Sequence, residues 1–299
     1  MMQLFTKSLC VSCLFFMQKR MIEMFSSALE VSRYRFTLEA VDTISLPVYK
    51  GSTFHGGFGH ALMKISPTWY RYFFEPGIDK KGDWPKPFVI LPPLDEKENY
   101  PKGYQFHCEL TLFGEAIQHY AIAQAAIEYL GAQMGLGYEQ GKYKIIDIEH
   151  TQPSIEKNAN QVDGQQHIKI HLPTRLRLKE NNKLQRHPPT FSLFCARLLG
   201  RLKTLETAYS GTQGDYQELI HKAQNIKIGN SHAKWDDWDR FSGSQKKWMK
   251  FGGLIGDVSY EGDLQPFMEV LKLGEWLHIG NKTSFGLGKY EMDLEGVKA

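Results

Sequence analysis

LHIGNKTSFGLGKY, the sequence from Leu277 to Tyr290, contains three glycines around a short polar run. Glycine adopts positive φ angles readily and lets another part of the backbone approach closely. A glycine loop with lysine and hydroxyl side chains can also hold phosphate groups, because its backbone N–H groups point into a concavity. The spacing matches neither GxGxxG nor the Walker P-loop and so does not indicate a nucleotide cofactor. The alternative is a glycine-rich hairpin before a strand over Lys289–Met292.

The same order of elements occurs earlier in the chain. A predicted helix over Glu115–Ala132 is followed by Gly-Leu-Gly at 135–137 and then by a strand. A predicted helix over Leu264–Leu273 is followed by Gly-Leu-Gly at 286–288 and then by another strand. Both strands begin with Lys-Tyr. A helix, a glycine motif and a strand that recur in this order indicate a duplicated unit.

Each half of the chain mixes strands and helices in β-α-β-β-α-β order, the ferredoxin-like pattern. Periodicity predicts strands over Ser32–Ala40, Pro85–Pro93, Tyr104–Phe113, Lys142–Ile148 and His167–Arg177, a helix from about Phe58 and a longer helix over Phe191–Tyr209. We therefore predict an α+β fold with two tandem ferredoxin-like domains, over residues 31–155 and 160–299, the second with a C-terminal glycine-rich loop. Residues 1–30 form an N-terminal extension to which no function is assigned.

Composition limits the class of protein but does not identify it. The 299 residues are 42% hydrophobic and 23% charged, which is enough apolar material for two cores. The net charge of +3 does not by itself indicate a nucleic-acid partner, so any basic surface must come from local clusters. Cys10 and Cys13 form the one CxxC pair, with no second pair to complete a zinc site, and four scattered cysteines fit a reducing cytoplasm rather than a disulfide framework. The apolar run Leu9–Met17 is too short to span a bilayer, so no membrane contact is expected.

Several separate segments resemble one family. The C-terminal sequence is similar to that of the CRISPR-associated endoribonucleases of the RAMP superfamily, which cut precursor CRISPR RNA. The matching pieces are Arg240–Ser242, Gly252-Gly253, Tyr260–Asp263, Leu273–Glu275, His278–Lys282 and Ser284–Gly288. Pro173–Leu178 and Phe54–Leu62 also resemble that family, so the similarity covers roughly residues 32–292.

The resemblance implies two ferredoxin-like domains that bind a stem-loop of CRISPR repeat RNA. It also implies a single metal-independent cut at the base of the stem, with no metal and no cofactor. In such chemistry the ribose 2′-OH attacks the phosphate and leaves a 2′,3′-cyclic phosphate and a 5′-OH. Other subunits of a CRISPR effector complex and a second copy of the chain are the further partners that the resemblance implies.

The family draws its catalytic histidine from the N-terminal domain near the first helix, which implies His60 and, as a second candidate, His55. Imidazole titrates near neutral pH and can serve as general base or general acid. Lys64 lies one helical turn beyond His60 and could hold the scissile phosphate. Tyr49 could donate a proton or position another group, and His55 could contact a phosphate. A lone helical histidine is more commonly structural or solvated. In the same way, Lys64 could be a solvated helix residue and Tyr49 could be a core residue.

Two stretches are candidates for RNA binding. Arg175, Arg177 and Lys179 alternate along one segment and could contact the backbone of an A-form stem. The alternative is a charged strand edge. In the glycine-rich loop the candidates are Gly280, Lys282, Ser284, Gly286 and Gly288.

Three functions are compatible with these features. The first is an endoribonuclease that matures CRISPR RNA. The second is a non-catalytic RNA-binding subunit of the same superfamily, which needs no His60/Lys64 pair. The third is an enzyme of phosphorylated metabolites that uses the C-terminal loop as its anion site.

Overall fold

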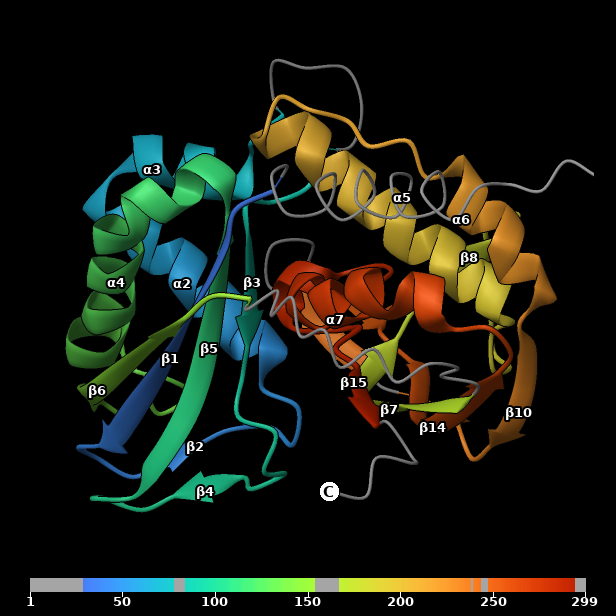
Figure 1. Ribbon diagram of the computed structural model, residues 1–299. Helices are drawn as coiled ribbons and strands as arrows, with labels where there is room; N and C mark the ends of the chain where they lie inside the picture. The colour runs from blue at the N-terminus through green and yellow to red at the C-terminus, as the bar shows by residue number, and fades with distance from the viewer. Residues whose placement is uncertain (1–28, 78–83, 154–166, 238, 243–246, 294–299) are drawn as a thin grey trace, which may run out of the picture.

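The computed structural model describes residues 29–77, 84–153, 167–237, 239–242 and 247–293. The run with Cys10 and Cys13, the apolar stretch Leu9–Met17 and the proposed domain boundary at 156–159 lie outside these ranges. Figure 1 shows two units of mixed helix and sheet side by side. No helix within the described ranges is both long enough and apolar enough to cross a membrane.

The N-terminal unit is a four-stranded antiparallel sheet in the order β3-β5-β1-β6. Its strands are β1 (Val31–Ala40), β3 (Phe88–Leu91), β5 (Gln105–Phe113) and β6 (Tyr143–Thr151). Between β1 and β3 lie α2 (Gly51–Ile65) and α3 (Pro67–Phe74), and between β5 and β6 lie η1 (Gly114–His119), α4 (Tyr120–Tyr129) and η2 (Leu130–Met134). A short pair, β2 (Ile44–Ser45) and β4 (Asn99–Tyr100), closes one end. The helices bury an apolar face against one side of the sheet (Figure 1).

The C-terminal unit repeats this topology, with its main strands in the order β10-β14-β7-β15. These are β7 (His167–Leu176), β10 (Lys227–Ser231), β14 (Gly253–Glu261) and β15 (Glu291–Asp293). The helical layer contains α5 (Phe191–Tyr209), α6 (Gln217–Lys222), η3 (Ala223–Asn225), η4 (Gln265–Phe267) and α7 (Met268–Leu277). The remaining elements are β8 (Lys179–Glu180), β9 (Lys183–Leu184), β11 (Lys234–Asp236), β12 (Asp239–Ser242), β13 (Lys247–Lys250) and η5 (Thr283–Phe285). The prediction of two tandem ferredoxin-like folds is confirmed.

One element begins earlier than the sequence pattern indicated. The helix expected from about Phe58 already begins at Gly51, and its first two turns contain three glycines, Gly51, Gly56 and Gly57. The glycines are there for packing: a Cβ on Gly57 would lie 2.8 Å from the Leu130 side chain, and one on Gly59 would lie 2.8 Å from Phe74. Helix α2 therefore packs closely against these neighbours at Gly57 and Gly59, because glycine has no side chain.

The glycine-rich loop after α7 connects the two units. The ring of Phe285 stacks on the ring of His55, with centroids 3.6 Å apart and an interplanar angle of 15°. The hydroxyl of Tyr49 donates to the Phe285 carbonyl at 2.8 Å. Gly286 has a φ of +81°, and a Cβ there would lie 2.7 Å from the carbonyl oxygen of Ile90 in β3. The loop therefore fits closely against both α2 and β3 of the N-terminal unit.

A second contact between the units is centred on Arg33 of β1. Its guanidinium carbon lies 4.0 Å from the centroid of the Trp276 ring in α7, and its Nη2 donates to the Glu275 carbonyl at 3.0 Å. Its Nε lies 3.6 Å from a carboxylate oxygen of Glu109 on β5. The half-buried arginine thus uses both its charge and its flat face to hold α7 against the N-terminal sheet.

His278 holds the start of the glycine-rich loop. It is buried, its φ is +56°, and its Nδ1–H donates to the Leu287 carbonyl at 3.2 Å. Burial, with the nearby charges of Lys289 and Arg33, lowers the pKa of His278 well below its usual value. The folded protein therefore keeps this imidazole neutral.

A substitution at Gly286 tests the close fit between the loop and β3. We expect Gly286→Ala to lower the free energy of unfolding by about 2–5 kcal/mol, since it adds a clash with Ile90 to the cost of a left-handed alanine. Gly103→Ala is the matched control: its φ is +84°, but a Cβ there meets nothing within 4 Å. Gly103→Ala should lower the free energy of unfolding by about 1–2 kcal/mol. Urea unfolding measures both changes, and equal losses of free energy in the two variants would contradict the close fit.

The buried neutral histidine predicts a dependence of stability on pH. Below about pH 6.5 the unfolded chain takes up a proton on His278 and the folded chain does not. The unfolded state then binds more protons, so the free energy of unfolding falls as the pH falls, by up to about 1.4 kcal/mol per pH unit from this residue. His278→Asn, which keeps a donor and tolerates positive φ, should remove that part of the slope. Urea unfolding at pH 7.5, 6.5 and 5.5 measures both slopes, and identical slopes would refute the assignment.

Candidate functional site

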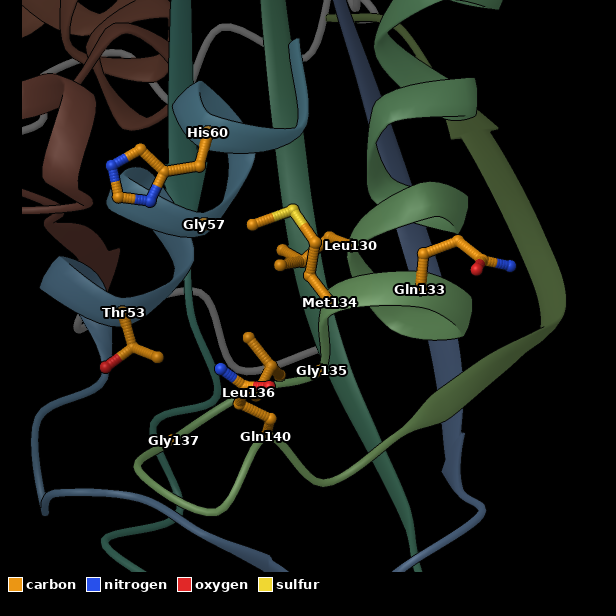
Figure 2. Close-up of a pocket in the computed structure, with 10 residues that line it drawn as sticks. All are labelled: Thr53, Gly57, His60, Leu130, Gln133, Met134, Gly135, Leu136, Gly137 and Gln140. Carbon is orange, nitrogen blue, oxygen red and sulfur yellow. The ribbon is translucent and has the colours of Figure 1, made fainter. Parts of the chain in front are cut away.

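A cavity of about 380 Å³ opens beside His60 in the N-terminal unit. Its walls come from α2, from η2 and from the turn that follows η2 (Figure 2). The residues that line it are Thr53, Gly57, His60, Leu130, Gln133, Met134, Gly135, Leu136, Gly137 and Gln140. The first of the two Gly-Leu-Gly motifs thus forms part of the wall.

Helix α2 determines which of its side chains reach this cavity. Thr53, Gly57 and His60 follow one another at spacings of four and three, so they lie along one face of the helix (Figure 2). The apolar residues Phe58 and Leu62 are buried on another face and fix the rotation of the helix. His60 is exposed as a consequence, and a molecule in the cavity can reach it.

Lys64 lies one turn beyond His60, in the last turn of α2, and is exposed. A cation is favoured there, because the C-terminal end of a helix carries partial negative charge. Lys64 is not among the residues that line the cavity. His60 and Lys64 therefore lie on neighbouring turns of α2, and Lys64 is nearer the C-terminal end of the helix.

Tyr49 and His55 lie in the contact between the two units. Both are buried, and His55 Nε2 lies 3.3 Å from Ser284 Oγ of the glycine-rich loop. Burial raises the pKa of the Tyr49 phenol far above its usual range, although Arg175 acts in the opposite direction. Neither residue lines the cavity beside His60. The four candidate catalytic residues thus separate into an accessible pair and a buried pair.

The two arginines proposed to bind RNA are largely engaged with the protein. Arg175, whose side chain is 15% exposed, forms a 2.5 Å ion pair with Asp236 and lies 5.4 Å from the ring centroid of Tyr49. Arg177 donates to the Gly252 carbonyl and lies 5.6 Å from the ring centroid of Phe251. Burial lowers the pKa of Arg177. Both side chains nevertheless lie on the opposite side of the backbone from the buried Leu176, as the alternation predicted.

The glycine-rich loop is held by its own backbone. The amides of Ile279, Asn281, Gly286 and Gly288 donate to the carbonyls of Gly288, Arg177, Thr283 and Arg175, at 2.8–3.2 Å. These N–H groups are therefore satisfied within the protein. Gly280 is half-buried and Ser284 is buried, whereas Lys282 is exposed, with a φ of +67°. Lys179 on β8 is also exposed.

The first Gly-Leu-Gly motif is evident in the sequence, but its place in the wall of a cavity is not. The sequence pattern also does not distinguish Thr53, Gln133 and Gln140, which line the cavity, or Tyr138, which follows the motif. Polar residues of these types are common on any surface, so their identity gives little signal. Within the described ranges, no group of three or more His, Cys, Asp or Glu side chains is arranged to hold a metal ion.

Family models match both halves of the chain. Residues 168–290 match the model of the CRISPR-associated endoribonuclease Cas6, and residues 29–171 match a model described as an N-terminal domain. No protein with a curated description matches the chain significantly. The two matched ranges meet near the start of β7, where the second unit of the structure begins.

Solved structures share the fold of nearly the whole chain. A chain of a partial Cas6-RT-Cas1–Cas2 complex superposes with a TM-score of 0.64 at 14% identity and covers 92% of this chain, which spans 48% of that one. Cas6 of Thermus thermophilus gives a TM-score of 0.56 at 14% identity, covering 90% of this chain and 100% of the other. A RAMP protein described as binding different RNA substrates gives 0.51 at 16% identity, covering 88% and 99%.

These findings agree with the resemblance found in the sequence. The model match covers the C-terminal unit with its glycine-rich loop, and the shared fold extends over both units. The C-terminal unit is therefore similar to the CRISPR-associated endoribonuclease Cas6, and both units share the fold of a solved Cas6 structure.

Proposed function

We propose that this protein cleaves precursor CRISPR RNA within the repeat, by a metal-independent reaction. The observation that carries the proposal is the exposed His60 beside an open cavity, in a chain whose other half matches the Cas6 family. The 2′-oxygen attacks the adjacent phosphorus while the bond from phosphorus to the 5′-oxygen breaks. The products are a 2′,3′-cyclic phosphate and a 5′-OH.

His60 acts in the proton transfers of this reaction. One group must remove the proton from the 2′-OH and another must deliver a proton to the leaving 5′-oxygen, and an accessible imidazole suits either step. Lys64, on the next turn of α2, supplies positive charge toward the phosphate as negative charge develops on it. Both residues lie on a helix whose opposite side is anchored in the core, so their separation is fixed.

Tyr49 and His55 act as positioning residues in this proposal. Both are buried, and both contact Phe285 of the glycine-rich loop. The Tyr49 phenol already donates its proton to a backbone carbonyl and has a raised pKa, which makes it a poor acid for the leaving group. Through these contacts the C-terminal unit sets the position of the start of α2 and hence of His60.

The RNA stem is held by exposed cations near the glycine-rich loop. Lys179 and Lys282 are exposed and contact phosphates directly. Arg175 and Arg177 are partly buried in ion-pair, carbonyl and aromatic contacts, and they reach the RNA with the remaining face of each guanidinium. The loop that presents Lys282 is shaped by Gly280, Ser284, Gly286 and Gly288.

The principal test is cleavage of a labelled CRISPR repeat RNA in excess EDTA. Wild type should give one discrete cut with a cyclic phosphate end, and His60→Ala should cut about 10²- to 10⁴-fold more slowly. His221→Ala is the matched control, since His221 is also exposed and helical but lies on α6 of the other unit. Full activity of His60→Ala would remove this residue from the mechanism. Binding without any cut in wild type would favour a non-catalytic RNA-binding subunit.

A second test concerns the exposed lysines. Lys282→Ala should weaken binding of the repeat RNA and reduce the slope of log K against log salt by about 0.7–0.9, because one phosphate contact is lost. Lys179→Ala should behave in the same way. Lys203→Ala is the control, since Lys203 is exposed on α5 in the helical layer of the same unit. Fluorescence anisotropy at several salt concentrations measures this slope. An unchanged slope in both Lys282→Ala and Lys179→Ala would contradict the assignment.

A further inference from the structure

Tyr138 is the most exposed of the large apolar side chains in the described ranges, at 99%. It directly follows the first Gly-Leu-Gly motif, in the turn between η2 and β6. An aromatic ring left wholly in water makes no contribution to the core. Such a ring is therefore available to a partner, provided that the backbone beneath it is held in place.

The backbone of this turn is held on both sides. Leu136 and Gly141 exchange two backbone hydrogen bonds, at 2.9 and 3.0 Å. Gly137 has a φ of +75°, and a Cβ there would lie 2.1 Å from the carbonyl oxygen of Ser45. The turn is thus seated against β2, and Tyr138 projects from a fixed base.

Tyr138 also borders a second hollow that continues the cavity beside His60. This hollow has a volume of about 710 Å³ and shares Thr53 and Gly137 with the first. Its lining residues are Ser45, Leu46, Pro47, Thr53, Glu98, Asn99, Gly137 and Tyr138. The two hollows adjoin at these shared residues and are together called the groove, which His60 lines in the first hollow and Tyr138 in the second.

The chemistry of the groove suits a base better than a phosphate. Among the described residues that line it, Glu98 is the one carboxylate, and lysine and arginine are absent. The other polar groups are hydroxyls and amides, such as Thr53, Asn99 and Gln140. Neutral donors and acceptors pair with base edges, whereas phosphates require cations. An exposed aromatic ring supplies the stacking surface for such a base.

We propose that this groove holds one unpaired nucleotide of the RNA, next to the linkage that is cut, and that the base of this nucleotide stacks on Tyr138. The inference rests on the proposed function, since His60 marks the position of the cut. Thr53 lines both hollows and is placed to contact the sugar or base of the bound nucleotide. Tyr138 is thereby a substrate-positioning residue rather than a catalytic one.

The test uses the full chain and a repeat RNA whose cut position, once mapped with wild type, carries a 2′-deoxyribose that prevents cleavage. 2-Aminopurine replaces each unpaired base in turn, and its fluorescence reports stacking. Wild type should quench one position close to the cut. Tyr138→Ala should abolish the quenching and weaken RNA binding about 5- to 100-fold. Tyr138→Phe should retain both, because the ring is kept.

Ile228→Ala on β10 is the control for loss of an exposed apolar side chain in the other unit, and it should match wild type. Wild-type quenching and affinity in Tyr138→Ala, with cleavage intact, would overturn this inference and leave the proposed function standing. Failure of wild type to bind the RNA would overturn both. A Tyr138→Ala variant that loses a protein partner but binds RNA normally would assign the ring to a protein interface instead.

Discussion

The stacked rings of His55 and Phe285 are the contact on which the geometry of the site depends. They join the start of α2 to the glycine-rich loop, which is itself hydrogen-bonded to the carbonyls of Arg175 and Arg177. Helix α2 then carries this constraint about one and a half turns further, to His60. The C-terminal unit therefore packs against the helix that carries His60, although every residue that lines the cavity belongs to the N-terminal unit.

The two Gly-Leu-Gly motifs show how a duplicated unit acquires two roles. The second motif follows Phe285, whose ring is packed against His55 and Phe251, so this copy is used in the contact between the units. The first motif precedes Tyr138, which is exposed, so this copy remains open and lines the groove. Both copies have the same Gly-Leu-Gly sequence. They differ in the neighbouring aromatic residue, which is packed between the units in the second copy and exposed in the first.

The positively charged side chains also fall into two groups, partly buried arginines and exposed lysines. Arg33 and Arg175 each pair with a carboxylate of their own unit, Glu109 and Asp236 respectively. Each guanidinium also lies near an aromatic ring of the other unit, that of Trp276 or Tyr49. Lys64 and Lys282 stay in water, where they are available to phosphates. This division suits the two side chains, because a guanidinium can pair and stack while partly buried, whereas an ammonium keeps its hydration. It also explains how a chain with a net charge of only +3 keeps local exposed cations, as the proposed RNA binding requires.

The sequence by itself determined the two ferredoxin-like units, the limits of α5, the alternation of Arg175 with Leu176 and the similarity of the C-terminal unit to Cas6. These depend on local periodicity and on motifs within one segment. It also placed His60 on the first helix. Only the tertiary structure decided that Tyr49 and His55 are buried between the units and that Tyr138 borders the groove of His60. Those outcomes depend on contacts between residues far apart in the chain, Phe285 with His55 and Gly137 with Ser45, which no local pattern specifies.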